Sequence, residues 1–259
     1  MESLVRFEVP TYGLAHVVID RPQARNALTW EAMRQFAEAV SAAQTTPDLR
    51  CLIVTGRPEA FCAGGDLFEL DAYPTRVDGA RLSALMAEAL DRLEALPIPT
   101  IAAIEGPALG GGAEIAVACD MRIMAEAATL GMMHVRLGIT PAWGGGQRLL
   151  RLTGYARALE WLTMGRVLTA QEAFSYGLAN RVVGKGQAMA EASAVAQSII
   201  ANDPASVQAA KRLLRAGILP PEGAAKAERA EFPDLWAAPA HLAASSAFLA
   251  SRNHRNVSR

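Results

Sequence analysis

Short apolar runs alternate with segments of helical periodicity along the first two thirds of the chain. The runs predict buried strands at 16–20, 52–55, 100–104 and 121–124. Apolar residues at helical spacing predict helices over 29–43, 81–96 and 113–118, and Thr29 is placed as the N-cap of the first. Strands that alternate with helices indicate an α/β fold with mainly parallel strand pairing.

From about Ala188 onward the apolar pattern is entirely helical. Apolar spacing predicts helices over 205–215, 224–232 and 236–252. We therefore expect a core domain over residues 1–190 and a C-terminal helical region over 191–259. That region would pack on the α/β body or on a neighbouring subunit.

Composition narrows the classes of protein that fit. The 259 residues are 51% hydrophobic and carry a net charge of −1, which gives no general attraction to nucleic acid or to a membrane surface. The three cysteines form no CxxC pair, so we expect no disulfide framework, no zinc site and a reducing, cytoplasmic location. We also expect no signal peptide and no membrane span.

Two glycine turns follow predicted strands and precede predicted helices. The first is Ala63–Asp66 (AGGD) and the second is Gly110–Gly112, with Glu114 just after it. The first N–H groups of a helix lack intrahelical partners and carry the positive end of the helix dipole. Because glycine allows a close approach to that backbone, two such turns that converge would form a pair of donors for one oxygen, an oxyanion hole.

Nucleotide binding fits the glycines less well. Neither turn has the GxGxxG spacing of dinucleotide-binding proteins, and no GK[ST] follows a glycine loop as in P-loop proteins. A single such turn is well explained as tight packing alone. Two turns with the same strand–turn–helix plan, each with an acid beside the glycines, favour a functional site over tight packing alone.

Several motifs together resemble the crotonase superfamily, also called the enoyl-CoA hydratase/isomerase family. They are GPALGGGAEIAVACD, FCAGGDL, LGITPAWGGGQRL, RPQARNAL and LTAQEAFSYGLANRVV. The resemblance covers most of the chain. It implies an α/β fold of repeated ββα units, with a C-terminal helical region that mediates homotrimers or hexamers.

The resemblance also implies site residues. The oxyanion donors would be the N–H groups of Gly65 and Gly111, which would hold a thioester oxygen as it becomes an enolate. Glu114 matches one of the two catalytic glutamates of the hydratases. The second acid of the hydratases is replaced here by His134, and this is the main departure from their pattern.

The departure resembles the ethylmalonyl-CoA decarboxylase branch of the family, in ALGGGAE, in the histidine that follows and in GITPAWGG. Loss of CO₂ from a 2-carboxyacyl-CoA produces the same enolate and needs no activated water. A second carboxylate would add a like-charge cost beside a carboxylate substrate. His134 would contact the leaving carboxylate, and Glu114, or a water that it holds, would protonate the α-carbon.

The acyl-CoA substrate brings phosphate charges that local groups must hold, and no separate cofactor is expected. The resemblance implies contacts in two loops near the glycine turns. The predicted substrate and CoA residues are Arg25, Ala63, Asp66, Leu67 and Trp143. Asp66 is also a natural helix cap, and Trp143 fits a core position equally well. Lys211, Arg212 and Arg215 form a basic stripe that fits either a solvated helix face or a phosphate contact.

The expected activity is therefore that of an acyl-CoA lyase acting through an oxyanion-stabilised enolate. The reaction expected first is decarboxylation of a short branched malonyl-type CoA. Hydration of a 2-enoyl-CoA and double-bond isomerisation are the alternatives. A non-catalytic CoA-binding subunit is a further alternative, although it would not need both glycine turns and Glu114.

Overall fold

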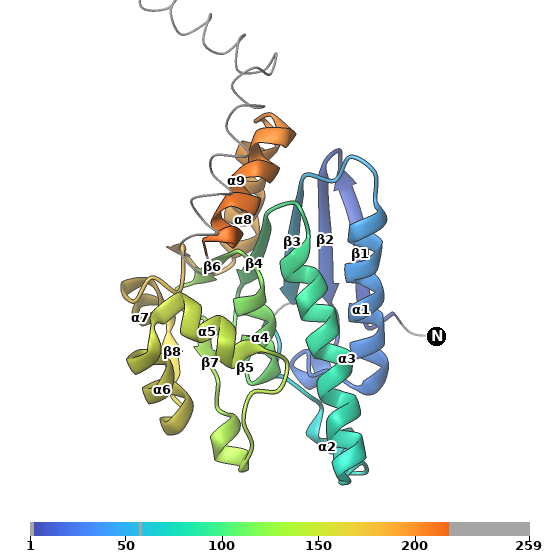
Figure 1. Cartoon of the computed structure of the whole chain (residues 1–259), viewed down its shortest axis with the longest axis vertical. Coiled ribbons are helices and arrows are strands. Elements are labelled where there is room, and N and C mark those ends of the chain that lie inside the picture. The colour runs from blue at the N-terminus through green and yellow to red at the C-terminus, as the bar shows by residue number, and fades with distance from the viewer. Residues whose placement is uncertain (1–2, 57–58, 218–259) are drawn as a thin grey trace, which may run out of the picture. The chain divides into compact units, whose positions relative to one another are not determined.

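The computed structural model describes residues 3–56 and 59–217 of the chain. The chain divides into two units, Met1–Ile200 and Ala201–Arg259. Every strand found among the described residues belongs to the first unit, and Figure 1 labels most of its helices and strands. Of the second unit, the structure describes the helix α9 (Pro204–Ala216).

A six-stranded sheet of order β1-β2-β3-β4-β6-β9 forms the centre of the first unit. The pairs from β2 to β9 are parallel and only β1 and β2 pair antiparallel, which confirms the predicted mainly parallel sheet. The strands are β1 (Val5–Thr11), β2 (Leu14–Ile19), β3 (Cys51–Gly56), β4 (Thr100–Ile104), β6 (Met121–Ala125) and β9 (Arg181–Val183).

A smaller sheet of order β5-β7-β8 lies beside the large one. Its strands are β5 (Ala108–Leu109), β7 (Thr129–Gly131) and β8 (Val167–Thr169). A parallel bridge between Cys62 and Ala108 continues this pairing toward the first glycine turn. Each of β3, β4 and β6 is thus followed by a short pairing segment and then by helix, which is the repeated ββα plan expected from the family resemblance.

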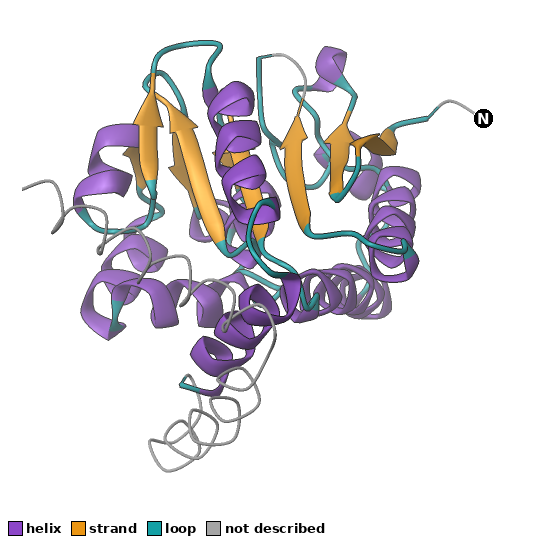
Figure 2. Ribbon diagram, turned by 90° about the horizontal axis from the view of Figure 1, so that it is seen from above, coloured by secondary structure: helices purple, strands orange, loops and turns teal. Residues whose placement is uncertain are grey.

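Helices cover the sheet (Figure 2). They are α1 (Trp30–Thr45), α2 (Leu67–Leu70), α3 (Arg76–Ala95), α4 (Gly111–Ala118), α5 (Gly145–Thr153), α6 (Tyr155–Met164), α7 (Ala170–Ser175) and α8 (Ala188–Ile200), with 3₁₀ turns η1 (Pro22–Ala24) and η2 (His134–Leu137). Strands β3 and β4 are buried along their whole length because helices such as α8 pack against them.

Two helices begin earlier than the apolar pattern predicts. Helix α3 starts at Arg76, where Thr75 and Asp78 form a reciprocal capping box, and not at residue 81. Helix α4 starts at Gly111, inside the glycine run, and not at residue 113. Thr29 caps α1 as predicted and accepts a hydrogen bond from the Ala32 N–H.

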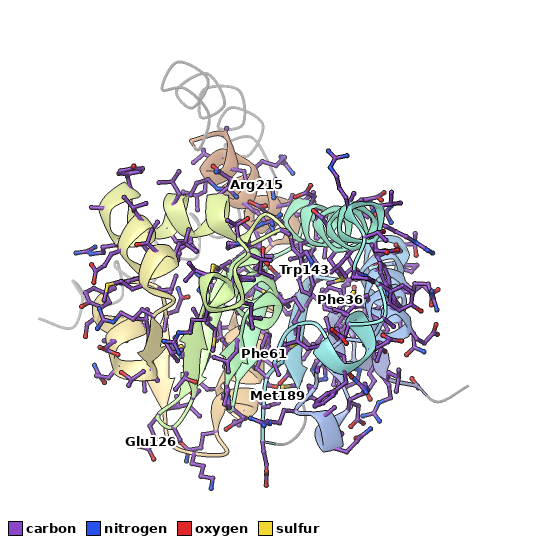
Figure 3. All side chains as sticks on the ribbon, turned by 90° about the horizontal axis from the view of Figure 1, so that it is seen from below. Phe36, Phe61, Glu126, Trp143, Met189 and Arg215 are labelled. Atoms are coloured by element: carbon purple, nitrogen blue, oxygen red, sulfur yellow. The ribbon has the colours of Figure 1, made fainter. Side chains whose placement is uncertain are left out.

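The core of the first unit is built from the apolar faces of these elements. Phe36 of α1 and Phe61, which precedes the first glycine turn, are both fully buried and are labelled in Figure 3. Among the described residues no helix is long and apolar enough to cross a membrane. The predicted helices over 224–232 and 236–252 lie outside the described residues.

Candidate active site

The two predicted glycine turns lie directly against each other. The Leu109 N–H donates to the Cys62 carbonyl oxygen at 2.9 Å. A Cβ added to Gly112 would lie 2.0 Å from that same oxygen, and one added to Gly64 would lie 3.0 Å from the Gly111 nitrogen. Side chains at these positions would separate the turns, so glycine is required for their contact.

The Gly65 and Gly111 amides occupy equivalent places in the two turns. Each follows a glycine in the left-handed region, with φ of +95° at Gly64 and +54° at Gly110. In the described part of the chain neither amide meets a hydrogen-bond acceptor, and Gly111 is the first residue of α4. As far as the described residues extend, the two donors that the sequence singles out thus lie in adjacent turns without an acceptor.

Cys62 immediately precedes the first turn but is not suited to be a nucleophile. Its side chain is fully buried, and burial raises the pKa of the Cys62 thiol to about 12, although the Gly64 N–H donates to the sulfur and favours the thiolate. The group is therefore a thiol at neutral pH, and a thiol is the unreactive form.

Glu114 is one turn along α4 from Gly111 and is 1% exposed. Its Oε2 accepts from the Trp143 and Gly145 N–H groups, both at 2.8 Å. The Ala142 N–H reaches Oε1 at 3.4 Å. All these partners are donors, as a carboxylate requires, because it accepts hydrogen bonds only.

His134 lies against Oε1 of that carboxylate. Its Nε2 is 3.1 Å from Glu114 Oε1, and the residue is 8% exposed. An ionised carboxylate only accepts hydrogen bonds, so a hydrogen bond across this contact would have Nε2 as its donor. Its Nδ1 is buried and has no partner within the residues that the structure describes.

Trp143 covers the second turn. A Cβ added to Gly111 would lie 2.1 Å from Cζ3 of the indole, so the ring rests directly on that glycine. Trp143 is 4% exposed, and its backbone N–H is one of the donors to Glu114. The residue therefore contacts both the predicted oxyanion donor and the predicted catalytic acid.

The other predicted binding residues gather around the first turn. The Ala63 N–H donates to the Arg25 carbonyl at 3.1 Å, so these two lie together, and the Arg25 side chain is exposed. Asp66 caps α2 by accepting from the Phe68 N–H and also pairs with Arg21 at 2.9 Å. Leu67 is 57% exposed. Their contact with CoA stays a prediction.

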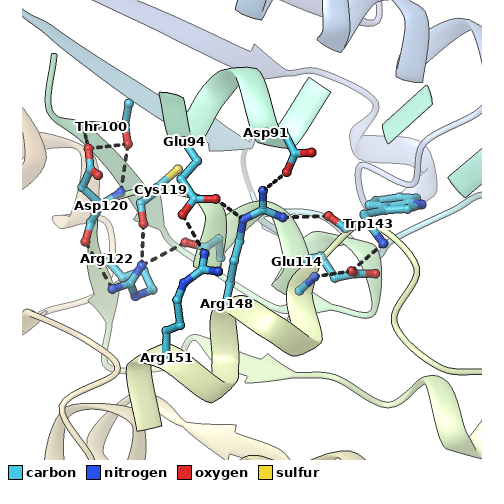
Figure 4. A network of polar contacts seen from close by, with 12 residues as sticks. Asp91, Glu94, Thr100, Glu114, Cys119, Asp120, Arg122, Trp143, Arg148 and Arg151 are labelled. Carbon is cyan, nitrogen blue, oxygen red and sulfur yellow. Dashed lines mark hydrogen bonds and ion pairs between the residues drawn. The ribbon is translucent and has the colours of Figure 1, made fainter. Parts of the chain in front are cut away.

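Sequence reasoning missed the residues that hold the Trp143 loop. Arg148 of α5 donates to the Trp143 carbonyl and pairs with Asp91 and Glu94 of α3 (Figure 4). The sequence offered a single signal, a cation within GGGQRL, and a sequence does not tell which acids such a cation meets.

Asp120 and Arg122, which follow α4, have structural contacts. Asp120 accepts from the N–H and hydroxyl of Thr100. Arg122 is buried and donates to backbone carbonyls that include Ala116 and Cys119 at the end of α4. Burial lowers the pKa of the Arg122 guanidinium, although Asp120 partly opposes this shift.

The remaining candidates lie elsewhere. Lys211, Arg212 and Arg215 are on α9, in the second unit, so their part in CoA binding stays a prediction. Within the described ranges, no group of three or more His, Cys, Asp or Glu side chains could hold a metal ion.

The fold is shared with solved members of one enzyme class. The crystal structure of an enoyl-CoA hydratase from Bacillus anthracis superposes with a TM-score of 0.90 at 32% identity, over 96% of each chain. YngF of Bacillus subtilis, whose name places it among the enoyl-CoA hydratases/isomerases, is 41% identical over 84% of each chain. Ethylmalonyl-CoA decarboxylase of Gallus gallus is 32% identical over 90% of this chain and 79% of its own.

The class is therefore that of the crotonase-fold acyl-CoA enzymes. The family model for enoyl-CoA hydratase/isomerase matches residues 11–237, and the chain belongs to that family.

Proposed function

We propose that the protein decarboxylates a short branched malonyl-type CoA, such as ethylmalonyl- or methylmalonyl-CoA, through a thioester enolate. The observation that carries the proposal is the partner of Glu114. Where hydration would use a second carboxylate, this site has His134, with Nε2 at 3.1 Å from Glu114 Oε1. A single carboxylate beside an imidazole suits a substrate that itself brings a carboxylate, because it avoids a second like charge.

In the proposed reaction the bond between Cα and the substrate carboxylate breaks. Its electron pair moves to Cα and is delocalised onto the thioester oxygen, and CO₂ leaves. The Gly65 and Gly111 amides hold that oxygen, and each such donor contributes roughly 3 kcal/mol of transition-state stabilisation. These amides are fixed before the substrate binds, so no rearrangement is needed during the reaction.

The enolate then takes up one proton at Cα. Glu114, or a water that it holds, is the proposed donor of that proton, and a proton from solvent restores the donor after CO₂ has left. His134 contacts the leaving carboxylate, and Glu114 holds the imidazole in place. The Trp143 ring, on Gly111, walls the acyl group and keeps water from the enolate.

Hydration of a 2-enoyl-CoA is the second candidate. It is favoured by the likeness to the Bacillus anthracis protein named as an enoyl-CoA hydratase. Glu114 would then orient the water, and His134 would have to replace the second acid in proton transfer to Cα.

Product mass separates the two reactions. The protein is incubated with ethylmalonyl-, methylmalonyl- and crotonyl-CoA, and the thioesters are followed by mass spectrometry. We expect loss of CO₂ from the first two at a rate far above that of water addition to crotonyl-CoA. Rapid hydration without CO₂ loss would overturn the proposal, and binding without turnover would favour a non-catalytic CoA-binding protein.

His134→Ala tests the role of the imidazole, and Gly79→Ala is its control. Gly79 lies on the exposed side of α3, and a Cβ there meets no atom within 4 Å, so this variant should keep the wild-type rate. His134→Ala should lower decarboxylation on the order of 100-fold, the size of a general acid–base contribution. Unchanged decarboxylation and hydration rates in His134→Ala would remove His134 from the mechanism.

A further inference from the structure

Arg148 is an unusual residue for its place in the fold. Its side chain is 4% exposed, yet it lies on α5, only three residues after Gly145. A buried cation is stable only when it is paired and its N–H groups are hydrogen-bonded. The contacts that satisfy Arg148 therefore show what the charge does in this position.

The guanidinium donates hydrogen bonds to three different groups. Nε pairs with Glu94 at 2.8 Å and Nη2 pairs with Asp91 at 2.6 Å, both from α3. Nη1 donates to the Trp143 carbonyl at 2.8 Å. The planar guanidinium fixes the angles among these bonds, so the loop carbonyl is held at a set position relative to α3.

The peptide units next to that carbonyl are those that hold the catalytic carboxylate. The Trp143 N–H and the Gly145 N–H both donate to Glu114 Oε2 at 2.8 Å. Gly144, between them, has φ of +85°, and a Cβ on it would lie 2.5 Å from Arg148 Nη1. The positive φ of Gly144 and its lack of a side chain thus allow the Arg148 guanidinium to approach the loop.

We propose that Arg148 is a positioning residue for the active site. It anchors the Ala142–Gly145 loop to α3, and the loop in turn orients the Glu114 carboxylate toward His134 and holds the Trp143 ring on Gly111. Figure 4 follows this path from Asp91 through Arg148 and Trp143 to Glu114. The proposal rests on the part of Glu114 in the proposed reaction.

Arg151 provides a matched control on the same helix. It also pairs with Glu94, at 2.7 Å, but its side chain is 35% exposed. The two arginines therefore share an acid and a helix, but within the described part of the chain it is Arg148 that donates to the loop. Loss of either cation weakens the α3–α5 pairing, whereas release of the Trp143 carbonyl requires the loss of Arg148.

The test compares Arg148→Met, Arg148→Lys and Arg151→Met in the full-length protein, with kcat, KM and thermal unfolding measured for each. Arg148→Met should lower kcat on the order of 100-fold while KM changes little, because a small misplacement of reacting groups has an effect of this size. Arg148→Lys should recover part of the rate, since an ammonium can still donate to one acceptor. Arg151→Met should keep the wild-type kcat.

A purely structural role gives a different result. Arg148→Met would then lower the melting temperature while kcat per folded molecule stayed the same, or Arg151→Met would lose as much activity, and either outcome overturns the proposal. If Arg148→Met does not fold, Arg148→Lys decides: a reduced kcat at unchanged KM supports the proposal, and a wild-type kcat overturns it.

A fluorescence measurement keeps this test apart from the proposed reaction. Trp143→Phe, made in the wild-type and Arg148→Lys backgrounds, isolates the Trp143 emission by difference. Because Trp143 is 4% exposed, its emission should be shielded from acrylamide in the wild type and more accessible in Arg148→Lys. Equal shielding overturns the positioning role even if no thioester is turned over, whereas absence of turnover alone contradicts only the proposed function.

Discussion

The two glycine turns share a plan but use their acids differently. Asp66, after the first turn, caps its own helix and pairs with Arg21, so local contacts occupy it. Glu114, after the second, takes its donors from residues 142–145 and its last partner from His134. Asp66 is thus engaged in local structural contacts, whereas Glu114 is oriented by segments distant in the sequence, as expected of a catalytic acid.

The two turns also differ in how closely other groups pack against them. The first turn is followed by the exposed residue Leu67, and a Cβ on Gly65 would meet the ends of two flexible side chains, Leu70 at 2.7 Å and Met33 at 3.8 Å. In the second turn, Gly111 is buried beneath the Trp143 ring and Gly112 is buried against the Cys62 carbonyl. We therefore expect the second turn to tolerate change less well than the first.

The largest expected effect separates the two acids. Glu114→Gln should lower kcat about 1,000-fold, because its NH₂ would face an N–H donor and it cannot hold the His134 proton in the same way. Asp66→Asn should keep most of the activity, since asparagine is an equally good helix cap and only the Arg21 ion pair is lost. Steady-state kinetics on the preferred thioester checks both. Equal losses in the two variants would contradict the distinction between the turns.

The contact between the turns can be broken at Gly112. Gly112→Ala would place a Cβ 2.0 Å from the Cys62 carbonyl oxygen. We expect it to lower the free energy of unfolding by about 3 kcal/mol and to reduce kcat as the two amides separate. Denaturant unfolding measures the first effect, and the exposed helical site Gly79→Ala, expected to gain about 0.5–1 kcal/mol, is the control. Wild-type stability in Gly112→Ala would show that the turns are not in contact.

The smallest expected effect is a pH dependence that belongs to neither turn. His16 of β2 is half-buried with an unpartnered Nε2 among the described residues, and burial lowers its pKa from 6.5, although Glu8 opposes the shift. Between the lowered folded pKa and 6.5, the unfolded chain binds more protons than the folded one. Stability from this group is therefore complete above pH 6.5 and is lost as the pH falls through that window.

His16→Leu should flatten this acid limb. Melting temperatures measured from about pH 8 down to about pH 5 should fall less steeply in His16→Leu than in the wild type. His134→Ala, at the site, should retain the His16 dependence. Parallel curves for wild type and His16→Leu would assign the acid sensitivity to another group.

Much of the fold could be predicted from local patterns. Apolar runs located β2, β3, β4 and β6, and Thr29 marked the start of α1. The starts of α3 and α4 were misplaced because their first turns carry polar residues or glycines, which give no apolar periodicity. The strands of three residues or fewer were missed because such short runs carry too little periodic signal.

The candidate site was predictable in its residues but not in its contacts. The motifs singled out Gly65, Gly111, Glu114 and His134, and the structure brings Glu114 and His134 into contact. The backbone donors at 142–145 could not be predicted, because every residue type except proline has a backbone N–H and the sequence does not tell which of them meet Glu114. The role of Arg148 could not be predicted either, because it depends on which residues the fold brings near its side chain. A pairing between α3 and α5 also depends on the tertiary fold.

The central claim is that the Gly65 and Gly111 amides share the thioester oxygen of the substrate. The most direct test is a crystal structure with a non-hydrolysable malonyl-type CoA analogue bound. We predict the carbonyl oxygen within roughly 2.7–3.1 Å of both backbone nitrogens. A carbonyl oxygen held by one of these amides only, or bound away from both, would contradict the claim.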